Sequence, residues 1–175
     1  YHPVAGDIDN DGDMDIFSLE YYVGNRLILN TTNTPTTSNT ITTSDSLALV
    51  AIFDQLDGDN WIQKVGWKVE KASEWFGVTL NLDNKRVIEL ALSSNELTGE
   101  IPEELALLTE LTSLSLEGNN LTGTASPLDQ LVNAEHIDVS GNQLSGFPDL
   151  SGITPLTTLK LENNHLTFGS IVPNA

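Results

Sequence analysis

The sequence predicts an α/β solenoid in which a short parallel strand recurs once per coil. Four segments of the C-terminal half align without gaps on a shared asparagine. They start at Val87, Leu111, Ala134 and Leu156, which are 24, 23 and 22 residues apart. Within each segment aliphatic and polar residues alternate, as in a strand with one buried face. Self-similarity at this period is typical of folds in which neighbouring repeats bury one continuous core.

The aligned segments form columns of equivalent residues. The aliphatic columns are Leu90, Leu114, Ile137 and Leu159, then Leu92, Leu116, Val139 and Leu161, then Leu97, Leu121, Leu144 and Leu166. A polar column holds Asn95, Asn119, Asn142 and Asn164. An asparagine amide both donates and accepts hydrogen bonds, so we expect this column to satisfy backbone groups where the chain turns inward after each strand. We interpret it as a structural ladder rather than a ligand site.

The pattern L-x-x-L-x-L-x-x-N-x-L resembles the leucine-rich repeat, here in four copies over residues 87–175. The resemblance implies a right-handed coil with a short parallel sheet on its concave side. Residues 45–86, with spaced tryptophans and the motif Trp75-Phe76-Gly77-Val78, look like the N-terminal cap of plant-type leucine-rich-repeat proteins. Plant members carry a Cys pair around that motif. This chain has no Cys, which makes it more similar to the Cys-free versions in secreted proteins of environmental bacteria.

Within the cap, the sequence predicts a helix over 47–56 with Asp45 or Ser46 as its N-cap. We expect one face of this helix to carry Leu47, Val50, Ala51 and Leu56. The three tryptophans, Trp61, Trp67 and Trp75, are expected to pack the cap over the end of the solenoid core. A platform for stacking carbohydrate is the alternative for these tryptophans.

Residues 1–30 contain an acidic loop, followed by an expected hairpin with strands near 14–22 and 26–30 that turns at Gly24-Asn25. The loop holds Asp7, Asp9, Asp11, Asp13 and Asp15. Such a cluster can supply the six to eight oxygens that Ca²⁺ prefers, so we expect a structural calcium site. Ser18 stands where an EF-hand has Glu, which disfavours an EF-hand. The segment resembles one partial FG-GAP/VCBS-type repeat of calcium-binding propellers.

A Thr-rich linker is expected over residues 31–44. A partial repeat precedes this linker, and no capping pattern follows Phe168. These two features suggest that the chain comes from a longer multidomain protein. The sequons Asn30-Thr31-Thr32 and Asn120-Leu121-Thr122 fit the pattern of N-glycosylation, which matters only in a host that has this modification.

The formal net charge of −18 argues against binding to nucleic acid or to an anionic membrane, and no apolar run is long enough for membrane insertion. The chain has no G-x-S-x-G motif and no Gly-rich phosphate loop after a strand, so we do not expect an enzyme. We expect a secreted or cell-surface binding module that recognises a protein or a glycan, or alternatively a structural spacer without a ligand. Any ligand is expected on the concave strand face, at Glu89, Ser113, Ser115, Glu117, His136, Asp138, Ser140, Thr158, Lys160 and Glu162.

Overall fold

The computed structural model describes residues 4–6, 15–18, 26–28, 41–69, 71–83 and 85–167. Its central feature is a five-stranded sheet with the spatial order β10-β9-β7-β5-β4. The strands are β4 (Val78–Leu80), β5 (Val87–Ala91), β7 (Ser113–Ser115), β9 (His136–Asp138) and β10 (Thr158–Lys160). From β5 to β10 every neighbouring pair is parallel, one strand per repeat, which confirms the predicted α/β solenoid.

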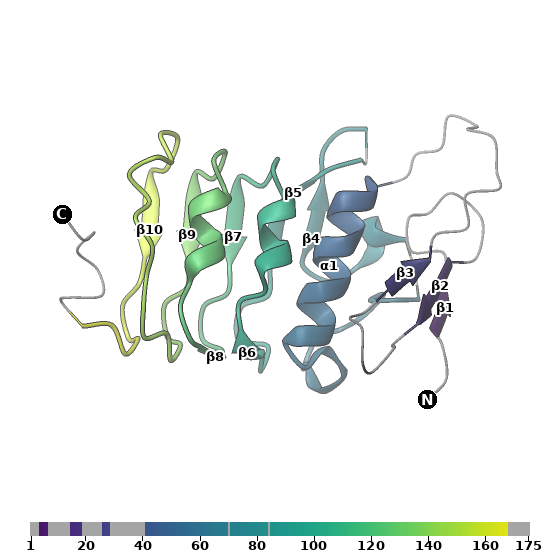
Figure 1. The fold of residues 1–175 in the computed structure, drawn as a ribbon, viewed down its shortest axis with the longest axis horizontal. Coiled ribbons are helices and arrows are strands. Elements are labelled where there is room, and N and C mark those ends of the chain that lie inside the picture. The colour runs from purple at the N-terminus through teal and green to yellow at the C-terminus, as the bar shows by residue number, and fades with distance from the viewer. Residues whose placement is uncertain are drawn as a thin grey trace.

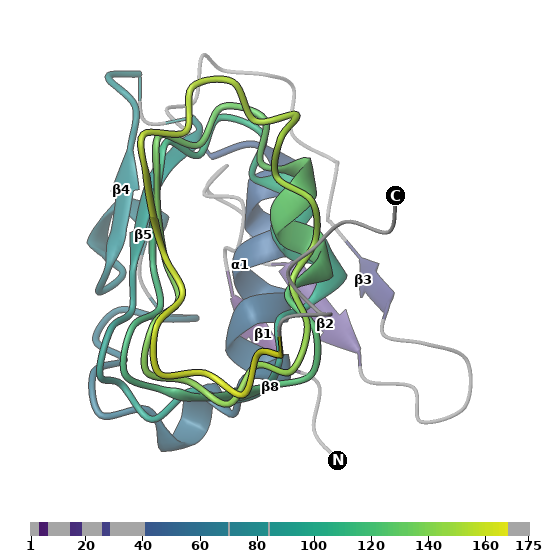
Figure 2. The same cartoon turned by 90° about the vertical axis from the view of Figure 1, so that its left-hand side faces the viewer.

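Each coil leaves the sheet and returns along other sides of the molecule. A second sheet pairs β6 (Thr98–Glu100) with β8 (Asn120–Thr122) in parallel. The 3-10 helices η3 (Glu103–Leu107) and η4 (Ser126–Gln130) follow these strands. Viewed along the solenoid, the large sheet lies on one side and the helices on the opposite side, with β8 at the lower turn between them (Figure 2). The second sheet was not predicted.

Helix α1 (Thr43–Gln55) packs beside η3 at the N-terminal end of the row of helices (Figure 1). It begins at Thr43, inside the segment expected to be a linker, and its N-cap is Thr42. The N-cap prediction of Asp45 or Ser46 is therefore wrong. The predicted face is also wrong in part, because Leu47 is exposed while the buried face includes Ala48, Leu49, Ile52 and Phe53. Asp45 is buried because it contacts Arg86 and the start of β5.

The cap also contributes β4, which runs antiparallel to β5. The predicted cap contained a helix and no strand. Gly77 precedes β4 with a φ of +79°, and the Ala91 amide donates to its carbonyl at 2.7 Å. A Cβ at position 77 would lie 2.2 Å from the Ala91 oxygen, so only glycine fits this crossing of the two strands without displacement. The glycine of the Trp75-Phe76-Gly77-Val78 motif thus allows the cap to join the sheet.

Aromatic side chains fill the space beneath α1. Trp61, Trp67 and Trp75 are 3%, 4% and 4% exposed, so they pack the cap and offer no surface for stacking a sugar. Trp67 lies at the centre of this cluster, with ring centroids 5.0 Å from Trp61, 4.8 Å from Trp75 and 5.6 Å from Phe53. The indole nitrogen of Trp61 donates to the Leu56 carbonyl at 2.8 Å, and that of Trp67 donates to the Phe76 carbonyl at 2.9 Å. Two short 3-10 helices, η1 (Gly58–Asn60) and η2 (Ala72–Glu74), complete the cap.

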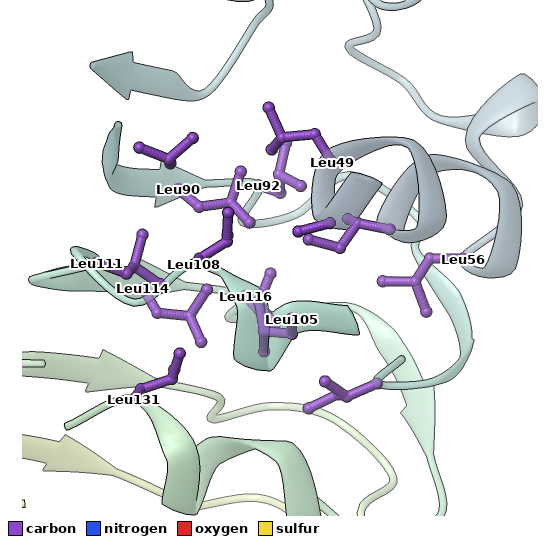
Figure 3. Close-up of a cluster of buried hydrophobic side chains, with 14 of the residues drawn as sticks. Leu49, Leu56, Leu90, Leu92, Leu105, Leu108, Leu111, Leu114, Leu116 and Leu131 are labelled. Atoms are coloured by element: carbon purple, nitrogen blue, oxygen red, sulfur yellow. The ribbon is translucent and has the colours of Figure 1, made fainter. Parts of the chain in front are cut away.

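The leucine columns form one continuous core that starts at α1 and passes through the coils (Figure 3). Leu90, Leu114 and Ile137 are at most 1% exposed. Leu159, the fourth member of that column, is 40% exposed, which corrects the expectation that it is buried like the others. Its strand β10 is the last in the described part of the sheet, so Leu159 is covered by a neighbouring repeat on one side only.

Three short strands near the N-terminus form a separate antiparallel sheet in the order β1-β2-β3. They are β1 (Val4–Gly6), β2 (Asp15–Ser18) and β3 (Arg26–Ile28). The second and third correspond to the two strands expected near 14–22 and 26–30, and both are shorter than expected. The first strand was not expected. Its pairing of Gly6 with Asp15 makes the acidic segment the connection between β1 and β2.

Candidate functional site

The outward-facing residues of the repeat strands share one surface, which we call the strand face. The register aligns Glu89, Ser113, His136 and Thr158 in a first column, and Ala91, Ser115, Asp138 and Lys160 in a second. A third column just after the strands holds Ser93, Glu117, Ser140 and Glu162, and backbone hydrogen bonds between successive turns keep these segments adjacent. The structure therefore brings the expected ligand-binding residues together on one side of the sheet, although they come from four separate repeats, and all of them except Ser140 are at least partly exposed.

An ion pair lies at the C-terminal part of this face. The Lys160 Nζ lies 3.0 Å from Oδ2 of Asp138 on the neighbouring strand. Burial raises the pKa of the Asp138 carboxyl, but hydrogen bonds from Ser140 and Lys160 outweigh it and hold the pKa below its ordinary value of 3.8. The hydrogen bond to Asp138, the charge of Asp138 and the charges of Glu117 and Glu162 raise the pKa of Lys160 above 10.5. The lysine of the strand face, Lys160, is thus paired with Asp138 and stabilised in its charged form by Glu117 and Glu162 on the same face.

Ser140 differs from the other residues expected to contact a ligand. It is only 6% exposed, and its Oγ donates to Asp138 Oδ1 at 2.6 Å while its backbone amide donates to the same oxygen at 3.1 Å. The longer side chains of Glu117 and Glu162 at the equivalent positions are exposed, whereas the short Ser140 side chain is held against Asp138. The expectation of direct ligand contact by Ser140 is therefore wrong, and its role is to orient Asp138.

Hydroxyl groups extend the face toward the cap. The Oγ atoms of Ser93 and Ser115 lie 2.7 Å apart, in adjacent coils. Thr79 in β4 donates from Oγ1 to Glu89 Oε2 at 3.2 Å, so the cap strand adds a polar residue next to the first repeat. Reasoning from the sequence missed Thr79, because it lies outside the repeats. The alternation of Val78, Thr79 and Leu80 directly before the repeats was the only signal.

The asparagine column lies inside the coil and not on the strand face. Asn119 Oδ1 accepts from the amides of Asn95 and Leu97 at 2.9 and 3.1 Å. Its Nδ2 donates to the carbonyls of Leu92 and Leu116 at 3.0 and 2.9 Å. Asn142 and Asn164 repeat this arrangement in the following coils. Asn95 extends it into the cap by donating to the Gln63 carbonyl at 2.9 Å. The side-chain amides of the asparagine column therefore form hydrogen bonds with backbone groups, as expected for a structural ladder.

No group of three or more His, Asp or Glu side chains that could hold a metal ion occurs among the residues whose side chains the structure describes. The expected calcium ligands Asp7, Asp9, Asp11 and Asp13 lie outside the described residues, and Asp15 is described only as a residue of β2. The calcium site therefore stays a prediction from the sequence.

Comparison with known proteins identifies the repeats. Residues 86–108 match the family model of the Leucine Rich Repeat. The chain is 38% identical to the leucine-rich repeat receptor-like protein kinase PXC2 of Arabidopsis thaliana over 109 residues. The aligned region covers 60% of this chain and 11% of PXC2. The chain is 33% identical to the receptor protein kinase WSS1 of rice over 105 residues, which cover 58% of this chain and 12% of WSS1. The chain thus spans about a tenth of the length of these relatives.

Solved structures show the same relationship at the level of the fold. The leucine-rich-repeat ectodomain of the receptor kinase SOBIR1 from Arabidopsis thaliana matches with a TM-score of 0.60 and 26% identity, covering 72% of this chain and 70% of that one. A chain of the PEPR1–AtPEP1 structure matches with a TM-score of 0.60 and 26% identity, covering 71% of this chain and 18% of that one. The BIR3–SERK2 complex from Arabidopsis thaliana matches with a TM-score of 0.54 and 30% identity, covering 67% and 69%.

Residues 86–108 thus match the leucine-rich repeat, and the repeats of this chain are similar to those of plant receptor-like kinases. The similarity to these kinases concerns the repeat ectodomain and not a catalytic domain. In the described part of the chain, no helix has the length and apolar character needed to cross a bilayer.

Proposed function

We propose that this chain is a non-catalytic interaction module of a secreted or cell-surface protein, and that its partner is a protein that presents basic side chains to the strand face. The observation that carries the proposal is the alignment of polar residues from four repeats in open columns beside one another. Its structural relatives include the repeat ectodomains of receptor kinases, and two of the similar structures pair one molecule with another, PEPR1 with AtPEP1 and BIR3 with SERK2.

The charge of the strand face selects the chemistry of the partner. The columns of the strand face contain one basic residue, Lys160, and four acidic residues, Glu89, Glu117, Asp138 and Glu162. The whole chain has a net charge of −18. A basic partner gains from both the local and the long-range field, which chiefly raises the rate of association and makes it sensitive to salt. The face has no aromatic residue in its columns, and interface hot spots are enriched in Trp, Tyr and Arg. We therefore expect weak binding with a strong dependence on ionic strength.

The test compares two double charge reversals on the full chain. Glu117→Lys with Glu162→Lys changes the strand face, and Glu103→Lys with Asp129→Lys makes the same change of charge on η3 and η4. Each chain is immobilised and screened against a displayed library of peptides that includes Lys- and Arg-rich members. Enrichment of basic peptides that is lost only in the strand-face variant supports the proposal. Equal loss in both variants indicates non-specific attraction to an acidic protein and overturns it.

A second variant locates the contact more closely. Simultaneous replacement of Glu117, His136 and Asp138 by alanine is expected to abolish binding while the far-ultraviolet circular dichroism spectrum stays that of the parent. Retained binding would place the site on another surface and contradict the proposal. A glycan array run in parallel tests the remaining class of ligand. Binding of a glycan without any peptide would replace the protein partner, and binding of neither would favour a structural spacer.

A calcium ion in the loop from Asp7 to Asp15 is also proposed, on the sequence alone. Five carboxylates in nine residues repel one another, and a hard cation with oxygen ligands would offset that repulsion. Its role would be to stabilise the connection between β1 and β2. Calorimetric titration with Ca²⁺ should give a binding isotherm that disappears in the variant Asp9→Asn with Asp11→Asn. The same isotherm in both chains would refute the site.

A further inference from the structure

Two adjacent asparagines in the second repeat have opposite environments. Asn119 is 6% exposed, and its amide makes the ladder contacts with backbone groups of two coils. Asn120, the next residue, begins strand β8 and is exposed. Within the described part of the chain, the Asn120 side chain makes no hydrogen bond. The side-chain nitrogen of Asn120 is therefore available for chemical modification. The same modification at Asn119 would remove the hydrogen bonds of the ladder.

Asn120 also has the sequence that such chemistry requires. It forms the sequon Asn120-Leu121-Thr122, and all three residues lie in β8. Leu121 is fully buried between coils, while Thr122 is partly buried. The backbone amide of Asn120 donates to the Leu97 carbonyl at 2.8 Å, so the main chain is held in place while the side chain points away from the core. We propose that Asn120 is an N-glycosylation site on the flank of the solenoid.

The modification is an exchange at one carbon atom. The Nδ2 of Asn120 forms a bond to the anomeric carbon of a lipid-linked oligosaccharide, and the bond from that carbon to the diphosphate of the lipid carrier breaks. The amide loses one proton, and the lipid diphosphate leaves with the bonding electrons. The co-substrate is a lipid-diphosphate oligosaccharide of a secretory compartment, so this inference rests on the secreted or cell-surface localisation of the proposed function, and not on its strand-face site.

The position of β8 determines what the glycan would do. β8 pairs with β6 in the second sheet, away from the five-stranded sheet that carries the strand face. Along the solenoid axis the two sheets occupy different sides of the coil (Figure 2). A glycan on Asn120 would cover this flank and leave the columns from Glu89 to Glu162 open. It would also shield the second sheet from pairing or packing with other chains.

The neighbouring coils provide matched positions for a test. Gln143, which is followed by Leu144 and Ser145, aligns with Asn120 and is also exposed. Gln143→Asn therefore creates a sequon in the same setting one coil later. The chain has a second natural sequon at Asn30, so every variant also carries Asn30→Gln. The full chain is expressed behind a secretion signal in a eukaryotic cell, and its intact mass is measured before and after treatment with peptide N-glycosidase.

With Asn30→Gln alone, we expect the mass of one glycan, which the glycosidase removes. Asn120→Gln and Thr122→Ala should each abolish the addition, and Thr122→Ser should retain it. The absence of a glycan on Asn120 would overturn the proposal. If Asn120 carries no glycan but the Gln143→Asn variant gains one, the flank is accessible to the glycosylating enzyme and Asn120 itself is not a substrate. Binding of basic peptides to the strand face is measured separately, so either proposal can fail alone.

Discussion

Asp45 and Arg86 join the first turn of α1 to the first strand of the repeats. The Arg86 Nε lies 3.2 Å from Asp45 Oδ1 and 3.3 Å from Oδ2, and the backbone amide of Val87 donates to the same Oδ2 at 2.7 Å. Asp45 is completely buried, whereas the Arg86 side chain is 23% exposed. One carboxylate therefore satisfies a cation and a buried backbone amide at the seam between cap and solenoid.

Asp45→Ala should lower the free energy of unfolding by about 2–3 kcal/mol, because the Val87 amide and part of the guanidinium lose their partner in a buried place. Asp129→Ala is the matched control. Asp129 is exposed and hydrogen-bonds only to its neighbour Gln130 among the described residues, so its loss should change stability by less than about 0.5 kcal/mol. Urea unfolding followed by tryptophan fluorescence measures both. Equal stabilities of the two variants would contradict the role given to Asp45.

The ladder position Asn119 should tolerate substitution far less than its neighbour. Asn119→Ala leaves the amides of Asn95 and Leu97 and the carbonyl of Leu92 without their partner, and we expect a loss of about 2–5 kcal/mol. Asn120→Ala removes an exposed side chain and should cost less than about 0.5 kcal/mol. The two variants differ by one position in the chain, which makes the pair a direct test. A small effect at Asn119 in urea unfolding would show that the ladder is dispensable.

The aliphatic column predicts a gradient of stability along the solenoid. Leu114→Ala removes a side chain that is 1% exposed between two coils and should cost about 3–5 kcal/mol. Leu159→Ala removes one that is 40% exposed and should cost about 1 kcal/mol. Chemical denaturation at equilibrium compares them. Similar losses would mean that Leu159 is covered in solution by something that this structure does not contain.

The sequence predicted the parts of the fold that depend on periodicity. Leu90, Leu114 and Ile137 recur with the spacing of the coils, and each is buried as that spacing requires. Contacts between distant residues were not predictable in the same way. Asp45 was expected to cap a helix, because nothing in the local sequence indicates that Arg86, 41 residues later, lies beside it.

The residues of the candidate site show the same division. The columns of the strand face follow from the repeat, since equivalent residues of parallel strands must align. The burial of Ser140 does not follow, because it depends on the hydrogen bond that its hydroxyl donates to Asp138. Thr79 was missed because β4 joins the sheet through a tight crossing at Gly77, outside the period of the repeats.

The ion pair of Asp138 and Lys160 predicts a specific dependence of stability on pH. Because the folded-state pKa of Asp138 is below its ordinary value of 3.8, its contribution is complete above that value. The contribution is lost as the pH falls below 3.8 and through the folded-state pKa. The difference in free energy of unfolding between the parent and Asp138→Asn should therefore be largest near neutral pH and should shrink in strong acid.

Lys160→Met provides the complementary measurement. Loss of the ammonium removes one hydrogen bond and one opposite charge from Asp138, so the pKa of this carboxyl should rise, while the Ser140 hydrogen bonds still oppose the effect of burial. Titration of the Asp138 carboxyl carbon by nuclear magnetic resonance reads this directly in the folded chain. The control is Asp149, which is exposed and has a lowered pKa caused by the hydrogen bonds from Ser151. Its midpoint should not move in the Lys160 variant. An unchanged midpoint for Asp138 would show that the ion pair does not persist in solution, and that Lys160 is free to meet a partner.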